Sequence, residues 1–173
     1  SPGAYLHKKP GFYLSEEPFI DDLRRALDLP PGTRHPLAYI MEAADDIAYC
    51  LADIEDSVEK GIFSIEQLAQ LLLDKFADHG SPDEAIAGPN RSFRSMVNYA
   101  LERAAKEPIN KVGEFFIWLR VTLVHPLVQH AAQQFIDNIE AVYHGTLDRA
   151  LLEDASLPNA IVQTFKDVAM DRV

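Results

Sequence analysis

The sequence predicts an all-α protein, a helical bundle, and three observations support that prediction. Apolar residues recur three and four positions apart through most of the 173 residues. Serine, glycine and proline stand where such helices would begin and end. No stretch shows convincing strand alternation, an internal repeat or low complexity. Because 47% of the residues are apolar, a chain of this length can bury a core.

Two helices are expected in the first part of the chain. The first covers residues 15–28, with acids in its opening turn and arginines toward its end, as the helix dipole favours. Leu29-Pro30-Pro31-Gly32 ends it. The second is long, covers residues 37–60 and stops at Gly61, a residue typical of helix C-termini.

Three more helical regions follow. Ser64-Ile65-Glu66-Gln67 is a capping-box pattern that opens a helix to residue 77, and residues 92–106 form the next one. Residues 112–145 are apolar at helical spacing, with a break or kink expected near Pro126, and a last helix begins near Pro158. We divide the chain into residues 1–77, a loop at 78–91, and residues 92–173.

Charge and composition exclude several classes of protein. The formal net charge is -11, and residues 15–59 hold twelve acidic side chains against three basic ones. Such a surface repels phosphate backbones, so non-specific nucleic-acid binding is not favoured. A single cysteine, Cys50, forms no internal disulfide, and no apolar run reaches the roughly 18 residues that cross a bilayer. We expect a soluble, cytoplasmic protein that does not bind membranes.

The helix at residues 37–60 has an acidic face. An apolar stripe contains Ile40, Ala44, Ile47, Leu51, Ile54 and Val58, and the opposite face carries Glu42, Asp45, Asp46, Tyr49, Asp53 and Asp56. The simplest interpretation is a solvated surface. However, each pair of like charges one turn apart costs roughly 0.2 to 0.5 kcal/mol. A bound divalent cation would relieve that repulsion, and the flat ring of Tyr49 between two carboxylates would suit a sugar.

Four segments carry a family resemblance: "KKPGFYLSEE", "PLAYIMEAADDIAYCLADIEDSVEKGIFSIEQL", "AAQQFIDNIEAVYHGTLDRALLEDAS" and "FKDVAMDRV". Together they resemble the bacterial deoxyguanosine triphosphate (dGTP) triphosphohydrolases of the HD phosphohydrolase superfamily. The resemblance implies metal-dependent hydrolysis of dGTP to deoxyguanosine and triphosphate, with Mg²⁺, Mn²⁺ or a similar divalent ion. It also implies a homo-oligomer, often a hexamer, and in some members a response to single-stranded DNA.

The same resemblance assigns roles to individual residues. Asp45 would be a metal ligand, with Asp46 as its nearest rival. Tyr49 would lie against the deoxyribose and Asp53 would accept a hydrogen bond from its 3'-hydroxyl. Lys9 would neutralise triphosphate oxygens, with Lys8 as the alternative. One helical turn separates Asp45, Tyr49 and Asp53, so all three are expected to project toward one pocket.

The sequence also departs from the family pattern. None of its six histidines is followed by Asp, so the family's His-Asp pair is absent and its earlier histidine cannot be assigned. We therefore expect a portion of a larger enzyme that is inactive alone. The rival hypothesis is a non-catalytic helical module whose acidic face binds a basic partner or a cation.

Two histidines flank Pro126 in the apolar region. His125 and His130 are five residues apart, which does not place both on one helical face, so they are not expected to share a metal. We expect packing or hydrogen bonding for them instead. For the aromatic residues of this region, Phe115, Phe116, Trp118 and Phe135, we expect packing in the core.

Overall fold

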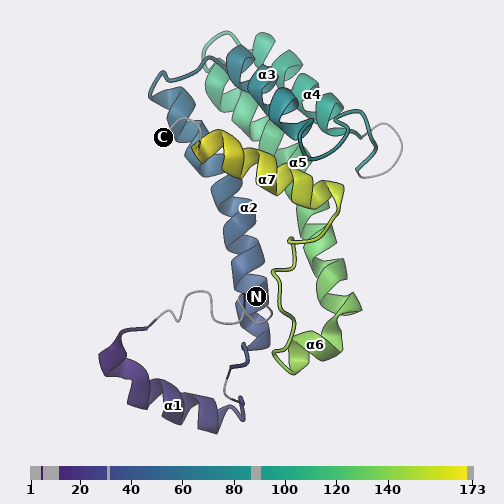
Figure 1. The fold of residues 1–173 in the computed structure, drawn as a ribbon. Coiled ribbons are helices and arrows are strands. Elements are labelled where there is room, and N and C mark those ends of the chain that lie inside the picture. The colour runs from purple at the N-terminus through teal and green to yellow at the C-terminus, as the bar shows by residue number, and fades with distance from the viewer. Residues whose placement is uncertain (1–4, 6–11, 31, 87–90, 171–173) are drawn as a thin grey trace. The chain divides into compact units, whose positions relative to one another are not determined.

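The computed structural model describes residues 5, 12–30, 32–86 and 91–170, and within these it confirms the all-α prediction (Figure 1). The elements in chain order are a short 3-10 helix η1 (Leu14–Glu16), α1 (Glu17–Ala26), α2 (Pro36–Glu59), α3 (Ile65–Phe76), α4 (Phe93–Ala105), α5 (Lys111–Asp137), α6 (Ile139–Tyr143) and α7 (Leu157–Met170). The described residues contain no strand beyond one isolated bridge between Ala85 and Ser92.

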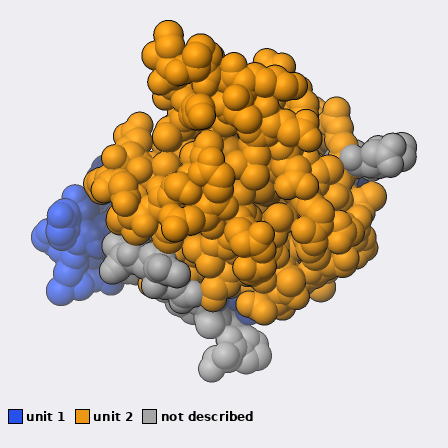
Figure 2. Space-filling view, turned by 90° about the horizontal axis from the view of Figure 1, so that it is seen from above, with its two compact units in different colours: residues 1–43, 131–153 blue, residues 44–130, 154–173 orange. Residues whose placement is uncertain are grey.

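The chain forms two compact units (Figure 2). Unit 1 consists of Ser1–Ala43 and Ala131–Glu153, and unit 2 consists of Ala44–His130 and Asp154–Val173. Helices α2 and α5 each contribute to both. The three-part division drawn from the sequence stays a prediction.

Unit 2 is held together by aromatic and aliphatic side chains from four helices. Helix α3 packs against both α4 and α7. The ring of Phe93 stacks on Phe76 with centroids 4.3 Å apart. It also lies nearly perpendicular to the ring of Phe165 on α7, with centroids 6.4 Å apart. Helix α5 adds a fully buried row at one-turn spacing, which is Phe115, Leu119, Leu123 and Leu127.

Local chemistry sets the helix ends in unit 2 as the sequence predicts. The hydroxyl of Ser64 accepts a hydrogen bond from the Gln67 backbone amide at 3.2 Å. The Ser64 amide in turn donates to the Gln67 side chain at 2.9 Å, which completes the capping box. Gly61, two residues after the last residue of α2, has a φ of +74°, which lies in the left-handed region that glycine tolerates best and stops the helix there.

Of the break or kink expected near Pro126, the break is wrong, and the kink stays a prediction. Helix α5 continues through Pro126 and ends at Asp137, and Asn138 separates it from α6. Proline removes one amide donor and crowds the preceding turn, which costs a helix about 3 kcal/mol. The buried Leu119, Leu123 and Leu127 surround this position on the helix, so burial of that face offsets the local cost.

Unit 1 contains η1, α1, the start of α2 and α6. No residue of α1 is buried. Tyr39 is fully buried in this unit, and its hydroxyl donates to the Leu147 carbonyl at 2.8 Å. Gly145, with φ of +64°, lies against the Arg34 backbone, where an added Cβ would come within 2.5 Å of the Arg34 oxygen. That approach requires glycine.

In the part of the chain that the structure describes, none of the helices combines the length and the apolar character needed to cross a bilayer.

Candidate functional site

The acidic face lies on α2, where the buried stripe is rotated slightly from the predicted one. Ile40 is 46% exposed and Ala44 is also exposed, whereas the buried positions are Tyr39, Ala43, Ile47, Cys50, Leu51, Ile54, Ser57 and Val58. The hydrogen bond from Tyr39 accounts for part of this shift, because it directs Tyr39 rather than Ile40 inward. The acidic face therefore lies beside Cys50.

Three of the residues predicted to form the site lie on the solvent side of α2. Asp45, Tyr49 and Asp53 are exposed, one helical turn apart, and Tyr49 keeps 58% of its surface accessible. Among the described residues, the Asp45 carboxylate has no hydrogen-bond or ion-pair partner. Its side chain is exposed.

Asp46, the neighbour of Asp45, has a different environment. The ammonium of Lys166 on α7 lies 2.9 Å from the Asp46 carboxylate. Asp46 keeps 23% of its side-chain surface exposed and Lys166 keeps 39%, so water screens this pair only in part. The sequence alone does not reveal this contact, because the two residues lie far apart along the chain.

A pocket of about 300 Å³ opens between α2 and α7. Its lining consists of Asp46, Tyr49, Cys50 and Asp53 from α2 and Gln163, Phe165, Lys166, Ala169 and Met170 from α7. Tyr49 and Asp53 therefore share one concave surface, as their predicted roles require, while Asp45 does not line it. Lys8 and Lys9 lie outside the described residues.

The pocket combines a carboxylate that can accept hydrogen bonds with an aromatic ring and an amide. Gln163 uses one side-chain N–H to donate to the Asn159 side chain at 3.3 Å. Its carbonyl oxygen and the Asp53 carboxylate are acceptors for a hydroxyl or an amine. Tyr49 supplies a flat apolar ring, and Met170 adds a flexible apolar wall. This set of groups suits a small, neutral and polar ring compound.

The described residues do not fit a divalent metal ion by themselves. They contain no group of three His, Cys, Asp or Glu side chains placed to hold one. A tight transition-metal site needs three or four ligands in fixed geometry. Asp45 can supply one.

Cys50 forms part of the pocket lining but is nearly covered, with 7% of its surface exposed. Burial raises the pKa of its thiol to about 12. Lys166 opposes this shift, and the carboxylates of Asp46 and Asp53 add to it. Cys50 is therefore a neutral thiol rather than a nucleophile at physiological pH.

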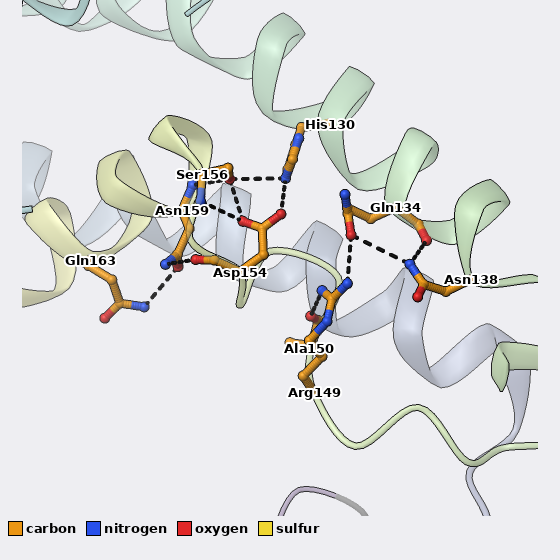
Figure 3. Close-up of polar contacts among 9 residues, drawn as sticks. All are labelled: His130, Gln134, Asn138, Arg149, Ala150, Asp154, Ser156, Asn159 and Gln163. Carbon is orange, nitrogen blue, oxygen red and sulfur yellow. Dashed lines mark hydrogen bonds and ion pairs between the residues drawn. The ribbon is translucent and has the colours of Figure 1, made fainter. Parts of the chain in front are cut away.

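A Ser-His-Asp cluster also lies in unit 2, at the start of α7 (Figure 3). His130 Nε2 contacts the Asp154 carboxylate at 2.7 Å and the Ser156 hydroxyl at 3.1 Å. Both contacts use the same ring nitrogen, whereas a nucleophilic triad needs one nitrogen for each partner. Ser156 also accepts from the Asn159 amide at 3.3 Å, so the cluster caps α7. The predicted hydrogen-bonding role of His130 is confirmed.

The second network in Figure 3 belongs to unit 1 and is structural. Arg149 donates to the Gln134 side-chain oxygen at 2.6 Å and to the Ala150 carbonyl at 3.1 Å. Asn138 donates to the Gln134 backbone carbonyl at 2.8 Å. These bonds tie the end of α5 to the segment that follows α6.

Comparison with known proteins supports the family resemblance. The chain is 73% identical over 171 residues to a probable deoxyguanosinetriphosphate triphosphohydrolase of Pseudomonas aeruginosa, covering 98% of this chain and 34% of that protein. It is 48% identical to a deoxyguanosinetriphosphate triphosphohydrolase of Serratia proteamaculans and 47% identical to one of Yersinia pestis. Each match covers 98% of this chain and 32% of the relative. No family model matches.

The resemblance to bacterial dGTP triphosphohydrolases is thus confirmed over nearly the whole chain. The chain spans about a third of the length of the curated relatives it matches.

Proposed function

We propose that this chain, which matches about one third of the length of bacterial dGTP triphosphohydrolases, contributes part of the nucleotide site of such an enzyme. The observation that carries the proposal is the pocket between α2 and α7. Tyr49 and Asp53 line it together, at the spacing that the family resemblance requires. The reaction would be hydrolysis of dGTP, in which water adds to the α-phosphorus and deoxyguanosine leaves with its 5'-oxygen protonated.

In this proposal the pocket binds the sugar of the substrate. The Tyr49 ring lies against the deoxyribose, and the Asp53 carboxylate accepts a hydrogen bond from the 3'-hydroxyl. Both contacts fix the nucleoside, so water can attack the α-phosphorus in line with the leaving 5'-oxygen. Neither residue takes part in bond breaking.

Asp45 rather than Asp46 is the carboxylate that we assign to a metal ion. Asp46 already has a cationic partner in Lys166, at 2.9 Å. A metal at Asp46 would have to displace that ammonium, whereas Asp45 is exposed and has no partner among the described residues. The ion would be Mg²⁺, Mn²⁺ or a similar divalent cation, of the kind that polarises phosphoryl oxygens. The described residues form no complete ligand set for such an ion.

The other features implied by the family remain proposals too. They are an HD-type domain, Lys9 on the triphosphate, a homo-oligomer such as a hexamer, a response to single-stranded DNA, and location in the cytoplasm. The similarity to deoxyguanosinetriphosphate triphosphohydrolases supports dGTP as the substrate. The non-catalytic module is less well supported, because relatives that match nearly all of this chain carry a hydrolase name.

The proposal is tested by replacing Asp45 in the complete protein that contains this chain. Asp45→Ala should lower dGTP hydrolysis by several orders of magnitude and weaken metal binding, while circular dichroism shows unchanged helicity. The reason is that Asp45 is exposed and contributes nothing to the core.

Asp56→Ala is the matched control. Asp56 is an exposed acid on the same helix, its only described ion pair is a loose one with Lys60 at 3.9 Å, and it lies outside the pocket. Its replacement should leave hydrolysis unchanged. Full activity of Asp45→Ala would refute the assignment of Asp45, and a wild-type protein unable to cleave dGTP would refute the proposed function.

A further inference from the structure

We propose that Lys166 is a positioning residue of the nucleoside pocket, which it serves through its ion pair with Asp46. This inference rests on the proposed function, because it takes the pocket between α2 and α7 to be the place where the sugar binds. Neither the family resemblance nor the relatives' names assign a role to Lys166.

The position of Lys166 is set by the buried face of α7. Phe165 is 1% exposed and packs edge-on against Phe93, and Val168 is likewise buried. Thr164, also buried, donates its hydroxyl to the Ala160 carbonyl at 2.7 Å. With these neighbours fixed in the core, the Lys166 side chain emerges beside α2 and its ammonium reaches Asp46.

Lys166 reduces the net negative charge of the pocket lining. The described lining contains two carboxylates, Asp46 and Asp53, and Lys166 is its one cation. Pairing with Lys166 offsets the charge of Asp46 and holds its oxygens toward α7. Asp53 is then the lining carboxylate left to accept a hydrogen bond from a sugar hydroxyl.

Loss of Lys166 would change this arrangement in two ways. Asp46 would become an unpaired, three-quarters-buried carboxylate in the same pocket as Asp53. Repulsion between the two would disfavour the orientation of Asp53 that binds the sugar, and Asp46 would turn toward water. Lys166 contacts no group proposed to take part in bond breaking, so the rate of the chemical step should not change.

The test uses Lys166→Met in the complete protein, with dGTP hydrolysis and deoxyguanosine binding as two readouts. We expect KM for dGTP and Kd for deoxyguanosine to rise together by about tenfold, equivalent to roughly 1.4 kcal/mol, with kcat within about twofold. Deoxyguanosine carries no phosphate, so an equal effect on both ligands identifies the nucleoside pocket. Lys166→Arg should retain both affinities.

The double variant Lys166→Met with Asp46→Asn removes the uncompensated charge and should recover most of the lost affinity. A purely structural role of Lys166 would not be rescued in this way. Arg120→Met is the matched control, since Arg120 pairs with Glu55 of α2 at 2.6 Å but belongs to α5 and lies outside the pocket. It should leave both constants unchanged.

Two results would overturn the inference. In the first, the wild-type protein is active, and Lys166→Met leaves KM for dGTP and Kd for deoxyguanosine as unchanged as Arg120→Met does. In the second, the double variant binds both ligands as weakly as Lys166→Met alone. A wild-type protein that neither hydrolyses dGTP nor binds deoxyguanosine contradicts the proposed function instead. The two failures are therefore distinguishable.

Discussion

Adjacent residues of identical chemistry have different environments on α2. Asp45 and Asp46 differ by one position, which rotates the side chain by about 100°. That rotation places Asp46 beside Lys166 and leaves Asp45 in water. The sequence cannot distinguish the two, because the distinction depends on a lysine from another helix. The ion pair supplies a physical reason for the choice of Asp45 that the family resemblance suggests.

Cys50 allows a prediction at the scale of one residue. Its pKa of about 12 is caused mainly by burial, which penalises the thiolate. Since the thiolate is the reacting form, a free cysteine with a pKa near 8.5 should react about three orders of magnitude faster at pH 7.5. We expect native protein to react with a disulfide reagent that much more slowly than protein unfolded in guanidinium.

Cys50 is the only cysteine, so the absorbance of the released thiol reports this site alone. The native rate should rise about tenfold for each pH unit between 7 and 9, because the thiolate fraction rises by that factor below the pKa. Fast native labelling at pH 7.5, independent of denaturant, would contradict the burial of Cys50.

At the scale of elements, the helix boundaries at Gly61 and Ser64 were predictable, whereas the continuity of α5 through Pro126 and its end at Asp137, instead of the expected Gly145, were not. Ser64 and Gly61 mark a helix start and a helix end through hydrogen bonds and backbone angles that depend on neighbouring residues only. Pro126 predicted a break by the same local logic. The burial of Leu123 and Leu127 on either side of it depends on other helices, and this burial keeps α5 continuous.

The start of α7 gives a prediction with a definite pH dependence. Although partial burial raises the pKa of Asp154, hydrogen bonds from Ser156 and His130 outweigh it and lower that pKa below its ordinary value. A carboxylate with a depressed pKa stabilises the folded state above its unfolded pKa of about 3.9, and this stabilisation is lost as the pH falls through the folded value.

Asp154→Asn should therefore lower the free energy of unfolding by about 2 kcal/mol at pH 7. The difference from wild type should shrink as the pH falls below the unfolded value of about 3.9 and on through the lower folded pKa, because the wild-type carboxylate then also becomes protonated. Thermal unfolding at several pH values measures both. Asp78→Asn, at an exposed site just after α3, is the control and should have little effect. A difference that does not shrink at any acidic pH where the protein stays folded would mean that charge is not the cause.

At the scale of the whole molecule, the fold class was predictable but the pocket was not. Apolar periodicity and caps give the helices and much of the core, including Phe115 and Phe116, because each depends on residues close in sequence. The pocket requires α7 beside α2. Long-range packing places Lys166 and Gln163 there, and nothing local in the sequence indicates that either residue lies beside α2.

The last prediction concerns the packing of unit 2, in which Phe93 is the central ring. It is fully buried, stacks on Phe76 and meets Phe165, so it links α4 to α3 and α7. Phe93→Ala would remove both ring contacts and leave a cavity, which typically costs 3 to 5 kcal/mol, on the order of half the stability of a small domain. We expect urea denaturation to show that loss.

Ile109→Ala is the matched control, because Ile109 is 91% exposed and its replacement should change stability by less than about 0.5 kcal/mol. Since Phe165 and Lys166 are neighbours on α7, Phe93→Ala should also weaken deoxyguanosine binding at temperatures below its unfolding transition. A loss of stability without any change in nucleoside affinity would show that the α7 wall of the pocket keeps its position independently of this aromatic cluster.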